Sequence, residues 1–88
     1  MNARHRRTLA ALFARPTLAS LPYADVVALL RALGADVDET REGSRVLIRL
    51  GGERTGFHKP HPQKEIKRYV VRELRDFLAA QGLTPDAE

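Results

Sequence analysis

Two consecutive glycines, Gly51 and Gly52, stand between two alternating runs, RVLIRL at residues 45–50 and RTGFH at residues 54–58. Alternation with a period of two is typical of a strand that buries one face. Glycine readily adopts the positive φ angles that a two-residue hairpin turn requires. The pattern therefore predicts a β-hairpin, and any fold of this chain has to include an antiparallel sheet.

The two faces of this hairpin differ in chemistry. One face carries the apolar side chains of Val46, Ile48, Leu50 and Phe57. The other face carries Arg45, Leu47, Arg49, Arg54, Gly56 and His58. We therefore expect arginine and histidine side chains from both strands to face solvent on an uncovered side of the sheet.

The N-terminal segment predicts a helix. Asn2 is a suitable N-cap, and the helix is expected to run to about Ala14, because Pro16 disfavours helical geometry in the residue before it. The apolar stripe of this helix consists of Leu9, Leu12 and Phe13. This stripe either extends the core or mediates dimerisation.

Two further helices flank the predicted strands. Helical spacing of apolar residues predicts one helix over residues 21–34, preceded by Ser20 and ended by Gly34. A short strand around Val37 and a turn at residues 41–43 follow. The last helix is expected from about Gln63 to Gln81. Its basic stripe is predicted to consist of Lys64, Arg68, Arg72 and Arg75.

These elements predict an α+β fold with α-β-β-β-α order, in which helices cover one face of a three-stranded antiparallel sheet and an extra helix precedes it. A chain of 88 residues suits a single domain with a small core. The absence of cysteine excludes disulfides and thiolate zinc sites. No apolar run approaches the roughly 18 residues that span a bilayer, and no secretory signal is evident, so we expect a cytoplasmic protein without membrane contact.

The net charge of +4 conceals an uneven distribution. Residues 41–75 contain ten Lys or Arg against four acidic residues, whereas residues 16–40 and 76–88 are each net acidic. Basic charge is therefore concentrated in the hairpin and the helix after it. Such a concentration favours binding to a phosphate backbone or to an acidic partner.

The order of four segments resembles the HicA toxins of bacterial toxin–antitoxin pairs. These segments are LPYADVVALLRALG, then GSR, then the hairpin leading to FHKPHPQKE, then a long helix. The resemblance covers roughly residues 21–82, leaving residues 1–15 as an N-terminal helix extension and residues 83–88 as a tail. It implies a fold like that of double-stranded RNA-binding domains, cleavage of messenger RNA without a metal or other cofactor, and inhibition by a HicB antitoxin.

One motif departs from the family pattern. The family has a Gly-Ser-His triplet with a catalytic histidine, and this chain has Gly43, Ser44 and Arg45. A second motif, Pro-x-His followed by a glutamate at the start of a helix, is matched by residues 60–65. The chain thus resembles a longer branch of the family. Because Arg45 stands at the position of the catalytic histidine, a catalytic base would have to be another histidine of the chain.

RNA cleavage without a metal requires a base for the ribose 2′-hydroxyl and a cation for the phosphorane oxygens. Histidine, with an ordinary pKa of about 6.5, suits the first task, and the arginine fork suits the second. The predicted catalytic residues are therefore His58 and His61, with Arg45 as charge stabiliser. We favour His58 as the base because it shares the open face with Arg45. The two histidines alone fall short of a zinc site.

The predicted RNA-binding residues are Arg45, Arg49, Arg54, Lys59, Lys64, Arg68 and Arg72. The same surface is expected to receive an acidic antitoxin. Because Arg45 replaces the family histidine, the alternative is a catalytically inactive RNA-binding or regulatory module with the same fold. A third interpretation is a protein-interaction domain that binds only an acidic partner. Tyr23 and Tyr69 are predicted to pack at the edge of the core.

Overall fold

The computed structural model describes residues 1–40 and 42–87. In chain order the elements are α1 (Ala3–Leu12), β1 (Ser20–Pro22), α2 (Tyr23–Ala32), β2 (Asp36–Asp38), η1 (Glu42–Ser44), β3 (Arg45–Leu50), β4 (Glu53–His58), β5 (Glu65–Lys67), α3 (Arg68–Ala79) and η2 (Pro85–Ala87). The predicted turn at residues 41–43 includes Arg41, and the predicted tail includes Glu88; both of these residues lie outside the described part of the chain.

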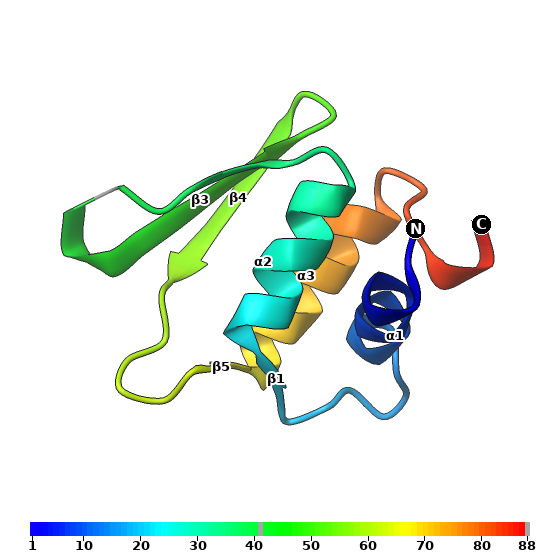
Figure 1. The fold of residues 1–88 in the computed structure, drawn as a ribbon, viewed down its shortest axis with the longest axis horizontal. Helices are drawn as coiled ribbons and strands as arrows, with labels where there is room; N and C mark the ends of the chain where they lie inside the picture. The colour runs from blue at the N-terminus through cyan, green and yellow to red at the C-terminus, as the bar shows by residue number, and fades with distance from the viewer. Residues whose placement is uncertain (41, 88) are drawn as a thin grey trace.

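The molecule has three layers, namely the main sheet, the pair α2 and α3, and α1 (Figure 1). The main sheet is antiparallel with the strand order β2-β3-β4. Helices α2 and α3 lie on one face of this sheet, and α1 packs against them on the side away from it (Figure 1). The predicted α+β arrangement with an added N-terminal helix is confirmed, and the N-terminal segment does not cover the other face of the sheet.

The hairpin forms as predicted. Strands β3 and β4 pair in the register Arg45↔His58 to Leu50↔Glu53, so Gly51 and Gly52 alone make the turn. Both glycines have positive φ, 61° and 80° respectively, which a side chain would strain. The Gln81 side chain lies against the position that a Cβ of Gly51 would occupy. The residues after α3 therefore pack against the tip of the hairpin.

The N-terminal helix belongs to the core. Asn2 caps it as predicted, because its side chain accepts a hydrogen bond of 2.9 Å from the backbone N–H of His5. Leu9 and Leu12 are only 2% and 0% exposed, and Phe13 is partly buried against the same cluster. The largest side chains that share this full burial are Leu29, Leu30, Ile48, Ile66, Leu74 and Leu78. The apolar stripe of α1 therefore extends the core of the single chain.

The sequence did not predict the second sheet. Strands β1 and β5 form a separate antiparallel ladder with Leu21 opposite Ile66. Both of these side chains are buried, and the residues that flank Ile66 are exposed. Pairing with β1 makes residues 65–67 a strand. The last helix therefore begins at Arg68, and the predicted start at Gln63 is wrong.

The later start of α3 also changes the predicted basic stripe. Lys64 lies before β5 and is not part of a helix. The Arg75 side chain is only 17% exposed and donates a hydrogen bond of 2.9 Å to the hydroxyl of Thr17. Of the four predicted members, Arg68 and Arg72 remain as exposed cations on α3.

Candidate active site

Arg45 and His58 lie directly opposite each other on the open face of the hairpin. The backbone N–H of Lys59 donates to the carbonyl of Ser44 at 2.7 Å, so residues 44 and 59 form a hydrogen-bonded pair. Because pairs alternate along an antiparallel ladder, Arg45 and His58 form the next, non-hydrogen-bonded pair, in which Cα atoms are about 4.5 Å apart and side chains are closest. The strand pairing therefore places Arg45 and His58 at neighbouring positions on the same face of the sheet.

Gly56 leaves the space that the Arg45 side chain occupies. A Cβ atom at Gly56 would lie 3.0 Å from a terminal nitrogen of the Arg45 guanidinium. The backbone carbonyl of Val46 would lie at the same distance, so a Cβ here would make two tight contacts, and the guanidinium would have to shift by a few tenths of an ångström. The glycine thus permits Arg45 to lie across the neighbouring strand, on the same face as His58.

A second cationic pair lies nearer the turn. Arg49 and Arg54 are directly opposite each other, and like charges in this position destabilise a hairpin. Arg49 also lies 3.8 Å from Asp36 on β2, but both side chains are more than half exposed, so this ion pair contributes little. A depression of about 450 Å³ is lined by Arg49, Arg54, Gly52 and Glu53. The basic part of the open face is thus its β3–β4 half, and the β2 edge carries acid.

His58 and His61 line the same depression, which has a volume of about 170 Å³. The loop between β4 and β5 brings His61 to it, and Lys67 and Tyr69 are among its other lining residues. Both histidines are exposed. Within the described chain, no hydrogen bond joins either imidazole to another residue, so both rings are available to a ligand.

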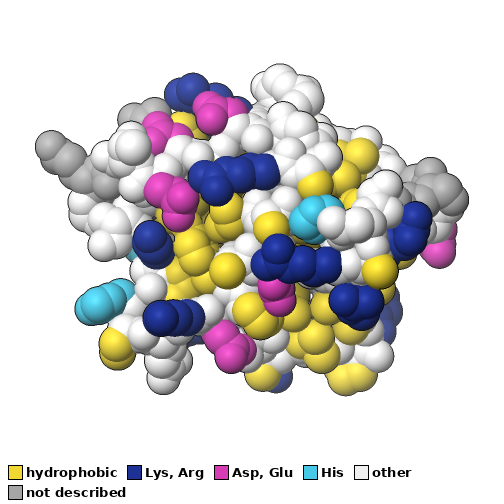
Figure 2. Space-filling view, viewed as in Figure 1, with side chains coloured by type: hydrophobic (Ala, Val, Ile, Leu, Met, Phe, Trp, Pro, Cys, Tyr) yellow, Lys and Arg dark blue, Asp and Glu magenta, His cyan; other side chains and the backbone are white. Residues whose placement is uncertain are grey.

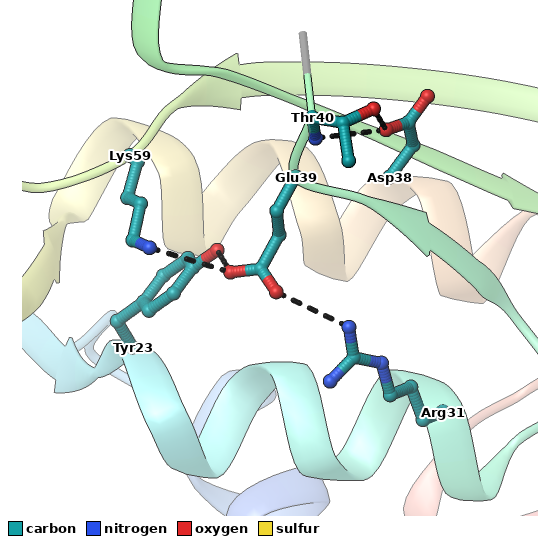
Figure 3. A network of polar contacts seen from close by, with 6 residues as sticks. All are labelled: Tyr23, Arg31, Asp38, Glu39, Thr40 and Lys59. Atoms are coloured by element: carbon teal, nitrogen blue, oxygen red, sulfur yellow. Dashed lines mark hydrogen bonds and ion pairs between the residues drawn. The ribbon is translucent and has the colours of Figure 1, made fainter.

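Lys59 also lines this depression, and its ammonium reaches toward the helices. Its ammonium lies 3.6 Å from the Glu39 carboxylate and 5.6 Å from the centre of the Tyr23 ring. Figure 3 shows that Tyr23, Arg31 and Lys59 surround Glu39. The Tyr23 hydroxyl donates to Glu39 at 2.6 Å, and Arg31 donates to the other carboxylate oxygen at 3.2 Å.

These contacts shift the pKa values of two groups in the network. The hydrogen bond from Tyr23 is the main reason why the pKa of the Glu39 carboxyl is lowered, and the bond from Arg31 adds to it. Burial, and then the bond to Glu39, raise the pKa of Tyr23 above its ordinary value. Glu39 is therefore anionic and Tyr23 is a protonated donor at neutral pH.

The predicted RNA-binding residues lie in three places. Arg45, Arg49 and Arg54 share the open face, whereas Lys59 lies between the sheet and α2. The other three, Lys64, Arg68 and Arg72, are exposed before β5 and on α3. On the face seen in Figure 2, basic side chains are interspersed with acidic ones. The excess of basic residues in the sequence therefore does not make the whole surface basic.

The Tyr23–Glu39–Lys59 contact was not predicted from the sequence. Tyr23 was expected only to pack at the edge of the core, which it does, with its ring edge-on to Phe57 at 6.2 Å. Its hydroxyl contact depends on β2 ending beside the first turn of α2, and no local pattern encodes that. The strand β5 had a weak signal, because Glu65-Ile66-Lys67 alternates with a period of two.

Comparison with known families matches residues 23–82 to the family described as the HicA toxin of bacterial toxin–antitoxin systems. The chain belongs to the HicA toxin family. The match covers α2 to the end of α3 and does not include α1. No curated protein and no solved structure matches the chain.

Membership of the HicA family makes this chain the toxin of a toxin–antitoxin system, with an antitoxin as its partner. Within the described residues of this HicA toxin, no helix combines the length and the apolar character needed to cross a bilayer. The same residues contain no group of three or more histidine and carboxylate side chains placed to hold a metal ion.

Proposed function

We propose that this HicA toxin is a metal-independent endoribonuclease that cleaves messenger RNA and is neutralised by a HicB-type antitoxin. The observation that carries the proposal is the Arg45–His58 pair on the open sheet face, beside the depression that His58 shares with His61. Two imidazoles can supply the general base and the general acid for transfer of an RNA phosphodiester, and a cation can stabilise the phosphorane oxygens. The family match supports the toxin role.

In the proposed reaction, the ribose 2′-oxygen attacks the adjacent phosphorus and the bond from phosphorus to the 5′-oxygen breaks. His58 accepts the proton of the 2′-hydroxyl, and His61 gives a proton to the leaving 5′-oxygen. The products are a 2′,3′-cyclic phosphate and a 5′-hydroxyl. The Arg45 guanidinium, which is always protonated, stabilises the phosphorane oxygens with its planar fork.

The remaining cations position the RNA strand. Arg49 and Arg54 bind phosphates near the turn, where the mutual repulsion of the two side chains is relieved by an anion. Lys64, in the loop before β5, and Arg68 and Arg72 on α3 supply further phosphate contacts. Lys59 is left out of this set because its ammonium is already paired with Glu39.

The test is cleavage of a defined RNA by purified toxin in the presence of a chelator. His58→Ala and His61→Ala are expected to lower the cleavage rate by about 10²- to 10⁴-fold, the range for loss of a general acid or base. Asp25→Asn, which removes the Arg4–Asp25 ion pair elsewhere on the surface, is the control and should cleave normally. Full activity in both histidine variants would remove histidine from the mechanism.

A second candidate function is RNA binding without cleavage. It is favoured by Arg45, which stands where the family motif has its catalytic histidine. A non-catalytic protein would bind RNA with strong salt dependence and leave it intact. The appearance of cleavage only in Arg45→His would support this function over the first.

The antitoxin is proposed to cover the open face of β3 and β4. Arginines on this face would pair with acidic side chains, and the antitoxin would inhibit by occupying the position of the RNA. Arg49→Glu and Arg54→Glu are expected to weaken the complex, as measured by titration calorimetry. RNA that fails to compete with the antitoxin would show that the two bind different surfaces.

A further inference from the structure

The loop between β4 and β5, residues 59–64, carries His61 and two of the five prolines of the chain. Its two ends lie next to β4 and β5, but these strands belong to different sheets. Pairing within one sheet therefore does not fix how one end of the loop lies relative to the other. The position of His61 relative to His58 depends on contacts at each end of the loop.

Tyr23 contacts the first end through its side chain. The Lys59 ammonium lies over the Tyr23 ring at 5.6 Å from its centre and 3.6 Å from the Glu39 carboxylate. The Tyr23 hydroxyl donates to the same carboxylate oxygen at 2.6 Å. Tyr23 thus holds Lys59 twice, once with its ring and once by orienting Glu39, as Figure 3 shows.

Tyr23 contacts the second end of the loop through its backbone. Its N–H donates to the carbonyl of Lys64 at 2.9 Å. Pro22, the residue before it, lies opposite Glu65 in the β1–β5 ladder. One residue at the start of α2 therefore meets both ends of the loop that separates His58 from His61.

Tyr23 itself is held firmly enough to serve as such a support. Its ring packs edge-on against the buried Phe57 at 6.2 Å, next to His58 in the chain. Arg31, two turns further along α2, fixes the other oxygen of Glu39. Tyr23 and Glu39 are therefore held in place by α2, by the core contact with Phe57, and by the ion pairs of Glu39 with Arg31 and Lys59.

We infer that Tyr23, acting through Glu39 and Lys59, is a positioning residue that holds residues 59–64 so that His58 and His61 face one depression. This inference rests on the proposed ribonuclease function. It assigns the Tyr23 hydroxyl a role in the geometry of the site, beyond packing at the edge of the core. It also explains why Lys59 faces the helices, because its charge anchors the loop.

The test compares Tyr23→Phe and Glu39→Gln with Asp25→Asn in the full-length toxin. Tyr23→Phe keeps the ring and the backbone N–H and removes only the hydroxyl. Asp25→Asn is the matched control, because Asp25 and Glu39 are both partly exposed carboxylates, 38% and 30%, that accept from an arginine. Thermal melts establish that each variant is folded.

We expect kcat to fall about tenfold in Tyr23→Phe and in Glu39→Gln, with KM within about twofold of wild type. The double variant should be no slower than the slower single variant, because both changes act through one contact. If Tyr23→Phe fails to fold, the surface variant Glu39→Gln decides the question. Unchanged kcat in the folded variants would overturn the inference.

Carbon–proton NMR spectra of the histidine rings provide a readout independent of activity. The His58 and His61 signals are expected to shift or broaden in Tyr23→Phe and Glu39→Gln and to stay in place in Asp25→Asn. If wild-type toxin leaves RNA intact, the proposed ribonuclease function fails, and these spectra still decide whether Tyr23 positions the loop. Ring signals that coincide with those of wild type would refute the positioning role.

Discussion

Replacing Leu12 by alanine tests whether α1 is an integral part of the domain, although it lies outside the matched family region. The Leu12 side chain is fully buried, with 0% exposure, among α1, α2 and α3. Truncation of a fully buried leucine to alanine costs about 2–5 kcal/mol. A domain of this size has a total stability of roughly 5–15 kcal/mol, so the change removes a large share of it.

The assay is unfolding by heat and by urea, with circular dichroism as the signal that monitors the loss of structure. For a chain of this length each kcal/mol lowers Tm by about 4–8 °C, so a loss of about 2–5 kcal/mol in Leu12→Ala should lower Tm by roughly 8–40 °C. Leu18→Ala is the matched control, because Leu18 is 39% exposed in the segment after α1. Its effect should stay within about 0.5 kcal/mol.

Two results would refute this reasoning. If Leu12→Ala destabilised the protein no more than Leu18→Ala, α1 would not be packed on α2 and α3 as described. If the Tm of wild type rose with protein concentration and Leu12→Ala removed that dependence, the buried stripe would mediate dimerisation. In the structure, the leucines of α1 are already covered within one chain.

Three further predictions concern the open face and the Glu39 network. Gly56→Val should shift the Arg45 guanidinium and lower RNA cleavage, with about 100-fold, the scale of a misplacement of about 1 Å, as the upper bound; normal cleavage in a folded variant would contradict this. Because the pKa of Glu39 is lowered in the folded state, its contribution to stability is present above its ordinary pKa and is lost as the pH falls through the lowered value. Unfolding curves of wild type and Glu39→Gln should therefore differ at pH 7 and converge in acid. Arg49→Gln and Arg54→Gln should each reduce the slope of log affinity for single-stranded RNA against log salt by about 0.7, and an unchanged slope would exclude a phosphate contact.

The hairpin and its faces were predictable because their signals are local. The alternation around Gly51-Gly52 determined the register, and the register determined that Arg45 and His58 face the same side. The N-cap at Asn2 was predictable for the same reason, since the bond spans three residues. Both signals lie within a short stretch of sequence, so they can be recognised without knowing the tertiary contacts.

The ladder of β1 and β5 was not predictable, because its partners are 45 residues apart and each strand has three residues. Ile66 also stands four residues before Val70, so its burial fits a helical period and conceals the strand. The contacts of Tyr23 with Glu39 and Lys59 are likewise long-range. They arise only when the main sheet docks on α2.

The three-layer arrangement has a practical consequence for handling this toxin. Helix α1 and the residues of η2 contact each other and lie on the side of the molecule opposite the hairpin (Figure 1). An affinity tag or a surface tether joined at either terminus would thus leave β3 and β4 exposed to the medium. Sensor-chip titrations with nucleic acid should for that reason agree with titrations of the untethered protein.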